Sequence, residues 1–100
     1  LIEDERKQIL FESSRTGYTC GLWMLFHYIT VASEHTSGVS TSDIMTLIRM
    51  IVENLFNCRT CREHFLDMYD RCLYGRCEIQ PTDFKKLQIW LWNVHNDATL

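Results

Sequence analysis

Apolar residues recur at helical spacing in several stretches of this chain. The clearest stripe lies within residues 44–55, at positions i, i+3, i+4, i+7, i+8 and i+11. Its members are Ile44, Leu47, Ile48, Ile51, Val52 and Leu55. Ser40, with Asp43 three residues later, matches a capping box that begins this helix. The stripe therefore predicts an amphipathic helix that packs against a core.

Three further helices are expected from the pattern. One covers about residues 20–32, and a second is expected from Cys58 to about Cys72. The last follows Pro81–Asp83 and ends near Asn96, since proline and threonine favour helix starts. No strand pattern is visible. The sequence therefore predicts an all-α fold, a four-helix bundle.

A single domain fits the length of the chain. One hundred residues leave room for one hydrophobic core. We interpret residues 1–19 as a lead-in segment and residues 20–100 as the domain itself. Leu1 is not an initiator methionine, and no signal peptide pattern follows it. We expect the chain to be a piece of a longer protein.

Charge and hydropathy exclude some partners. The formal net charge is -3, and lysine and arginine form no basic stripe. Nucleic acid is therefore not a predicted partner, because phosphate binding depends on clustered basic residues. No apolar run reaches the roughly 18 residues that a membrane-spanning helix needs, so no membrane segment is predicted.

Five cysteines suggest an oxidising compartment or a metal site. Four of them form two close pairs, Cys58/Cys61 and Cys72/Cys77, and Cys20 is left over. A short turn separates Cys72 from Cys77, so a disulfide across it is easy to form. We predict a structural disulfide there.

Three chemistries are open to the Cys58/Cys61 pair. Two thiols at this spacing can close a small disulfide, bind a metal, or cycle between dithiol and disulfide. With Asn57 as N-cap, both would lie in the first turn of a helix, where the macrodipole favours thiolates. A structural disulfide here would close only a tiny loop, with a small gain in chain entropy.

Zinc and a thioredoxin-like site both fit the context less well. His64 and the second cysteine pair could complete a zinc site, but zinc knuckles place the first pair on a turn, not after a long helix. Thioredoxin motifs follow a strand. A redox pair in a helical domain needs an electron acceptor, which a flavin would supply.

Aromatic and histidine residues on the helices could form the walls of such a site. A flavin dinucleotide needs flat apolar surfaces and a few directed hydrogen bonds. Singly, each of these residues is more often part of a core. The candidates are Trp23, His27, His64, Trp92, His95 and Asn96, whereas His35 lies in a polar loop.

Three pieces of the chain together resemble one family. They are Cys-Gly-Leu-Trp-Met-Leu-Phe-His at 20–27, Phe-Asn-Cys-Arg-Thr-Cys-Arg-Glu-His-Phe at 56–65 and Trp-Leu-Trp-Asn-Val-His-Asn at 90–96. In order and spacing they cover most of residues 20–97. They resemble the Erv-type flavin-dependent sulfhydryl oxidases, and most closely the Erv domain of the quiescin sulfhydryl oxidases.

The resemblance implies an enzyme, a thiol oxidase that holds FAD in a four-helix bundle with a short fifth helix. It would convert protein dithiols to disulfides and pass the electrons to oxygen, giving hydrogen peroxide. Cys58 would be the interchange thiol and Cys61 the flavin-proximal thiol, which would add to the flavin. By the same resemblance, flavin contacts are matched by Trp23, His27, His64, Trp92, His95 and Asn96, with Arg15 as a further candidate.

The chain also departs from the family pattern. After His95 and Asn96 the family continues with a valine and an asparagine, where this chain has Asp97, Ala98 and Thr99. The later flavin contacts and the fifth helix are missing here or lie on another segment. In the quiescin group the cysteine that matches Cys20 pairs upstream, but residues 1–19 hold no cysteine, so Cys20 stays unassigned.

Partners and location follow from the same resemblance. Protein dithiols would reach the site through a thioredoxin-like domain that this chain does not contain. The expected location is an oxidising compartment, the secretory pathway or the extracellular space, rather than the mitochondrial intermembrane space. The alternative is a disulfide-stapled or zinc-binding helical interaction module without catalysis.

Overall fold

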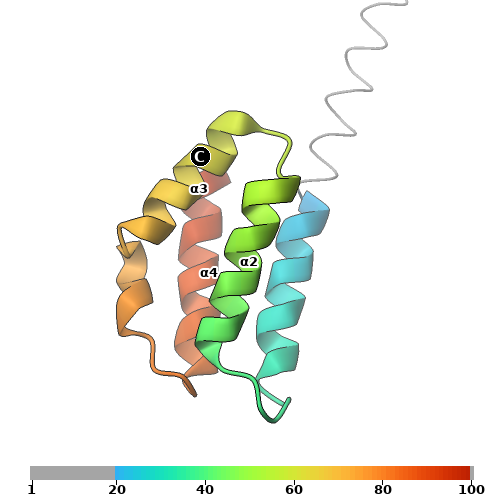
Figure 1. Cartoon of the computed structure of the whole chain (residues 1–100), viewed down its shortest axis with the longest axis vertical. Coiled ribbons are helices and arrows are strands. Elements are labelled where there is room, and N and C mark those ends of the chain that lie inside the picture. Colours follow the sequence, from blue (N-terminus) through green and yellow to red (C-terminus); the bar gives the residue numbers. More distant parts are fainter. Residues whose placement is uncertain (1–19, 100) are drawn as a thin grey trace, which may run out of the picture.

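The computed structural model describes residues 20–99 and confirms the all-α fold (Figure 1). A first helix covers residues 20–33. The later elements are α2 (Thr41–Leu55), α3 (Arg59–Asp70), the 3₁₀-helix η1 (Leu73–Glu78) and α4 (Phe84–Thr99). This part of the chain contains no strand, and its four α-helices form the predicted bundle. Arg15 and the rest of the predicted lead-in segment lie outside the described residues.

The predicted capping box begins α2. The backbone N–H of Asp43 donates to the Ser40 hydroxyl at 3.1 Å, and the backbone N–H of Ser40 donates to the Asp43 carboxylate at 3.0 Å. Two of the N–H groups at this helix end are thereby satisfied. The buried Thr41 hydroxyl then donates to the Gln80 carbonyl at 2.9 Å, which ties the start of α2 to the connection before α4.

The boundaries of α3 differ from the sequence-based prediction. Cys58, and not Asn57, is the N-cap, and its sulfur accepts the backbone N–H of Cys61 at 3.2 Å. The helix ends at Asp70 rather than near Cys72, because Cys72 has a φ of 58° and leaves the right-handed helical region. The chain then turns into η1.

The core receives side chains from every helix of the bundle. Its fully buried members include Phe26, Ile48, Phe65, Leu87, Trp90 and Leu91. Most of the predicted α2 stripe is buried or half-buried. Leu55 is the exception at 47% exposure, because it is the last residue of the helix. The capping box and the apolar stripe together place α2 against the core.

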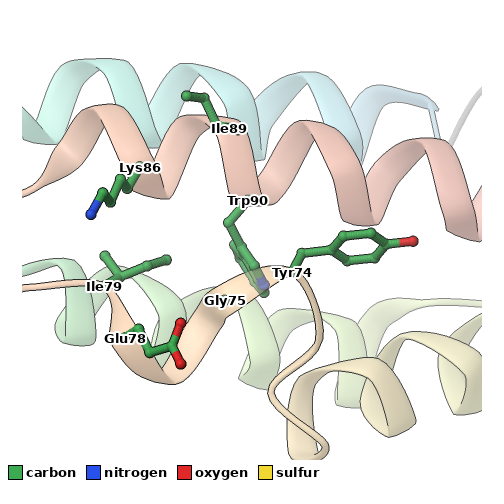
Figure 2. Close-up of a pocket in the computed structure, with 7 residues that line it drawn as sticks. All are labelled: Tyr74, Gly75, Glu78, Ile79, Lys86, Ile89 and Trp90. Atoms are coloured by element: carbon green, nitrogen blue, oxygen red, sulfur yellow. The ribbon is translucent and has the colours of Figure 1, made fainter.

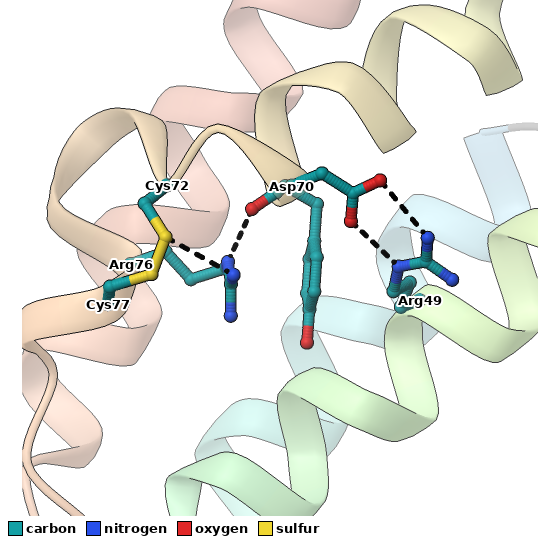
Figure 3. The surroundings of a disulfide bond; sticks show 6 residues. Arg49, Asp70, Cys72, Arg76 and Cys77 are labelled. Atoms are coloured by element: carbon teal, nitrogen blue, oxygen red, sulfur yellow. Dashed lines mark hydrogen bonds and ion pairs between the residues drawn. A yellow bond between two sulfur atoms is a disulfide. The ribbon is translucent and has the colours of Figure 1, made fainter.

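Arg49 joins α2 to α3 at the surface. Its guanidinium donates to both carboxylate oxygens of Asp70, at 3.3 and 3.2 Å, as Figure 3 shows, and it also pairs with Glu53 at 3.0 Å. These exposed ion pairs contribute little to stability singly. The Arg49–Asp70 pair links two helices that the core already holds together.

None of the helices within residues 20–99 combines the length and apolar character that crossing a bilayer requires.

Ile48→Ala tests the core. The side chain is fully buried, so its truncation removes apolar contacts and should cost about 2–5 kcal/mol of unfolding free energy in a denaturant titration. Met50→Ala is the matched control on the same helix: its side chain is 53% exposed, and its loss should cost no more than about 0.5 kcal/mol. Equal costs for the two variants would contradict this packing.

Candidate functional site

One end of the bundle gathers the predicted site. Figure 1 shows that the end of α2, the start of α3 and the C-terminal end of α4 meet there with the start of the 20–33 helix. Trp23 of that helix contacts the rings of Phe56, which follows α2, Phe65 of α3 and His95 of α4. A single indole therefore touches side chains from the whole bundle.

Cys58 and Cys61 form a disulfide at the start of α3. Their Cα atoms are 5.3 Å apart, within the usual range for this bond, and both residues are half-buried. Cys61 also packs against the hydrophobic core. Of the three chemistries open to the pair, the structure shows the disulfide. Within the described residues, no group of three histidine, cysteine or acidic side chains could hold a metal ion.

Positive charge lies near this disulfide. The Arg62 guanidinium donates to the Phe56 carbonyl at 2.9 Å and so holds the segment that leads into Cys58. Arg59 is exposed and pairs with Glu63 at 3.0 Å. A thiolate released from the disulfide would lie at the positive end of the α3 macrodipole with Arg62 close by, and both effects favour the ionised form.

Trp23 and His95 form a parallel stack at the end of the bundle where α3 begins. Their ring centroids are 4.3 Å apart and the planes differ by 10°. Trp23 also meets Phe56 edge to face, with centroids 5.7 Å apart, and Phe56 lies two residues before Cys58. The predicted aromatic wall is therefore linked to the cysteine pair through Phe56, a connection that sequence spacing alone could not establish.

His27 and His95 lie side by side across the helix interface. His27 Nε2 is 3.1 Å from His95 Nδ1, so one ring donates and the other accepts. Burial lowers the pKa of both histidines below the ordinary 6.5, and for His95 the neighbouring His27 lowers it further. Both rings are therefore neutral at physiological pH.

His64 belongs to a polar cluster that the sequence did not reveal. Its Nε2 is 3.1 Å from an Asp97 carboxylate oxygen, and the Tyr74 hydroxyl donates to the other oxygen at 2.5 Å. This hydrogen bond lowers the pKa of Asp97, with a smaller contribution from His64, and raises the pKa of Tyr74. These three residues come from α3, η1 and α4, far apart in sequence, so no local pattern signals the cluster.

The structure leaves two predicted contacts on the surface. Trp92 is 60% exposed and Asn96 is also exposed, whereas Trp90, two positions before Trp92, is the tryptophan of α4 that fills the core. The free Cys20 is exposed as well.

The chemistry of this bundle end fits a flavin. The buried Trp23 ring stacks on the half-buried His95 ring, and the neutral imidazoles of His27 and His95 can form directed hydrogen bonds. The half-buried disulfide is at the same end of the bundle. Some of this hydrogen-bonding capacity is used within the protein, since His27 pairs with His95 and His64 pairs with Asp97.

A cavity of about 250 Å³ lies elsewhere, between η1 and α4 (Figure 2). None of the predicted flavin contacts lines it. Trp90 does, and its buried indole N–H is a side-chain donor without a hydrogen-bond partner in the described structure. An unsatisfied buried donor of this kind costs about 1–3 kcal/mol. The cavity is therefore separate from the cysteine pair and its aromatic wall.

The second cysteine pair also forms a disulfide. Cys72 follows the end of α3 and Cys77 lies in η1, with Cα atoms 5.4 Å apart. The bridge closes the turn that presents Tyr74 to Asp97. The predicted pairing is confirmed, and the turn it closes contributes to the polar cluster around His64.

These features are a helical bundle, a disulfide at a helix start and a tryptophan–histidine stack at the same bundle end, and together they are typical of a redox domain. The Erv1/Alr family model matches residues 20–99, which are all of the residues that the structure describes. The chain belongs to the Erv1/Alr family.

Several relatives carry the name sulfhydryl oxidase. Sulfhydryl oxidase 1 of Oryza sativa subsp. japonica is 33% identical over 92 residues, which cover 89% of this chain and 16% of that protein. Sulfhydryl oxidase 2 of Arabidopsis thaliana is 37% identical over 83 residues, covering 80% of this chain and 14% of that protein. Sulfhydryl oxidase 1 of Cavia porcellus is 33% identical over 91 residues, covering 85% of this chain and 14% of that protein. The chain thus spans about a sixth or less of these relatives. No solved structure matches it significantly.

The neutral histidine pair predicts a loss of stability in acid. The folded pKa values of His27 and His95 are lowered, so the unfolded chain binds more protons as the pH falls. Their contribution is complete above the unfolded value of about 6.5 and is lost as the pH falls through the folded values. Thermal unfolding over a pH series measures this loss.

His27→Gln should reduce the dependence of the melting temperature on pH. His35→Gln is the control, because His35 is an exposed loop residue, and it should keep the wild-type dependence. The interpretation is wrong if the wild-type melting temperature is constant below about pH 6.5, or if His27→Gln shows the full wild-type loss.

Tyr74→Phe should raise the pKa of Asp97 toward its ordinary value, because the hydroxyl that donates to the carboxylate is removed. An NMR titration that follows the Asp97 carboxyl carbon measures this pKa. Tyr28→Phe, which removes an exposed hydroxyl from the 20–33 helix, should leave the pKa of Asp97 unchanged. An Asp97 pKa that is the same in wild type and Tyr74→Phe would show that this contact is not formed in solution.

Proposed function

We propose that this domain is an FAD-dependent thiol oxidase that converts protein dithiols to disulfides and passes the electrons to oxygen, giving hydrogen peroxide. The observation that carries the proposal is the half-buried Cys58–Cys61 disulfide at a helix start, at the same end of the bundle as the Trp23–His95 stack. Family membership and the names of the relatives support it.

The two cysteines have different surroundings, which supports different roles. Cys58 is the N-cap residue, before the first helical turn, whereas Cys61 lies within the helix and packs against the core. In the proposed reaction a substrate thiolate attacks the Cys58 sulfur, the Cys58–Cys61 bond breaks, and Cys61 leaves as a thiolate. The second substrate thiol then attacks the mixed disulfide, which releases the oxidised substrate and Cys58.

The N-terminal end of α3 favours the departure of Cys61 as a thiolate when the Cys58–Cys61 bond breaks. The Cys61 thiolate forms in the first turn of α3, where the free N–H groups and the macrodipole are positive. Cys61 is also half-buried and packs against the core cluster that contains Trp23, so it is partly shielded from water.

Trp23, His27, His64, Trp92, His95 and Asn96 are the residues proposed to hold the cofactor, with Arg15 as a further candidate. FAD would supply the two-electron acceptor that a thiol pair lacks and would return the electrons to oxygen. In this role the Trp23–His95 stack would form an aromatic wall of the site, and the neutral His27 would offer a directed hydrogen bond.

The proposal extends to partners and location. Protein dithiols are the proposed substrates, delivered through a thioredoxin-like domain elsewhere in a longer protein. An oxidising compartment, the secretory pathway or the extracellular space, suits the two disulfides.

Oxygen consumption with a dithiol tests this function. The FAD-supplemented wild type should consume oxygen when dithiothreitol or a reduced protein is added. Cys61→Ser and Cys58→Ser should each fall to the background rate, because either change removes the exchangeable disulfide. Cys20→Ser, which removes the exposed free thiol, should keep the wild-type rate.

Two outcomes would overturn the proposal. One is a wild-type rate no higher than that of Cys61→Ser. The other is a protein that consumes no oxygen and instead binds stoichiometric zinc, which would establish the binding-module alternative.

A further inference from the structure

We propose that the Cys72–Cys77 disulfide, besides closing its turn, is a second site of thiol–disulfide exchange, in which an incoming thiolate attacks Cys77 and the departing Cys72 thiolate is held by Arg76. The inference goes beyond the proposed oxidase function and does not depend on a flavin. Its support comes from exposure, from the position of the Arg76 guanidinium, and from the backbone of the turn.

The two cysteine residues of this bond differ in exposure. Cys77 is an exposed residue of η1, whereas Cys72 is half-buried behind the end of α3. A nucleophile from solvent therefore reaches Cys77 first. Which sulfur is attacked determines which one departs, so Cys72 becomes the leaving group.

Arg76 is positioned to receive that leaving group. Its Nη2 lies 3.4 Å from the Cys72 sulfur, as Figure 3 shows. Two further contacts fix the guanidinium in place: Nε donates to the Tyr69 carbonyl at 2.7 Å, and the guanidinium carbon lies 3.7 Å from the centroid of the Tyr69 ring. A guanidinium remains protonated in proteins, so a permanent positive charge lies beside the sulfur that would ionise.

The macrodipole of α3 opposes the stabilisation of the Cys72 thiolate by Arg76 but does not cancel it. Cys72 follows the C-terminal end of α3, where the partial charge is negative and disfavours a thiolate. That partial charge is about half a unit spread over several carbonyls. The guanidinium carries a full unit charge in contact with the sulfur, and one of its nitrogens already donates to a carbonyl of this helix end. The nearer and larger charge dominates.

The backbone of the turn also favours opening. Cys72 and Tyr74 have φ angles of 58° and 59°, in the left-handed region that residues other than glycine rarely adopt. Conformations of this kind persist only when their surroundings enforce them. The bridge spans a sequence separation of five, and so short a loop gains little chain entropy from closure. Exposed disulfides in strained segments are the ones that exchange readily.

This thiol–disulfide exchange needs no added oxidant. A thiolate R–S⁻ forms a bond to the Cys77 sulfur, the Cys72–Cys77 bond breaks, and Cys72 takes the electron pair as a thiolate. The products are a mixed disulfide on Cys77 and a free Cys72. Where R carries a second thiol, that thiol releases Cys77, so R is oxidised to a disulfide and the pair is reduced to a dithiol.

Glutathione is the probe that tests the site. The purified full chain is equilibrated with reduced and oxidised glutathione, quenched with acid and alkylated, and each cysteine is assigned by tandem mass spectrometry. The expected product carries glutathione on Cys77 and the alkyl label on Cys72. Glutathione on Cys72 with the label on Cys77, or a pair that stays intact, would overturn the proposal without any variant being needed.

The rate of this exchange isolates the contribution of Arg76. Arg76→Gln should slow it by about tenfold, because a charge-assisted contact to the leaving thiolate is lost. Arg76→Lys should recover part of the rate by restoring the charge. Arg71→Gln is the control: Arg71 is in the same turn but pairs with Asp67, so its loss should leave the rate unchanged. Equal rates for Arg76→Gln and Arg71→Gln would contradict the assigned role.

Discussion

The contacts of Trp23 are the constraint on which this structure most depends. The indole is 2% exposed, and it contacts Phe26 of its own helix, Phe56 after α2, Phe65 of α3 and His95 of α4. Three of these contacts are tilted or edge to face, and the one with His95 is parallel. One side chain therefore sets the distances among the elements that carry the candidate site. Phe56, which precedes the disulfide at the start of α3 by two residues, is one of the rings held against this indole.

The side chains around Trp23 both pack the core and form the candidate site. A stacked imidazole in a partly buried position stays neutral, and a neutral imidazole can both donate and accept a hydrogen bond. The groups that complete the core at this end are thus the groups that could contact a planar cofactor. The two ends of α3 differ in electrostatic environment. The Cys58–Cys61 disulfide lies at the positive end of the helix dipole, whereas Cys72 lies at the negative end with the Arg76 guanidinium beside it.

Periodic and local signals in the sequence predicted most of the fold. The stripe and capping box of α2 placed that helix correctly, because both depend on spacing within one element. The N-cap of α3 was misplaced by one residue, since Asn57 has the better cap side chain by type, whereas the structure uses the Cys58 sulfur. The end of α3 depends on the left-handed conformation of Cys72, and cysteine carries no sequence signal for it.

The candidate site was predictable only in part. Cysteine spacing and the family resemblance pointed to Cys58, Cys61, Trp23 and the histidines, and the structure places several of these in contact. Asp97 and Tyr74 were missed as partners of His64, because the contacts join residues 33 and 23 positions apart along the chain. Arg76 was missed for a similar reason: its contact with Cys72 requires the irregular turn of η1, which no periodic pattern describes.

We propose that a flavin binds at the Trp23–His95 end of the bundle, which also carries the Cys58–Cys61 disulfide. The absorption spectrum of the purified protein is the decisive measurement. We expect a yellow protein with a flavin absorption band, and FAD released on denaturation in a ratio of about one per chain. A colourless protein that takes up no FAD when the cofactor is supplied would contradict it.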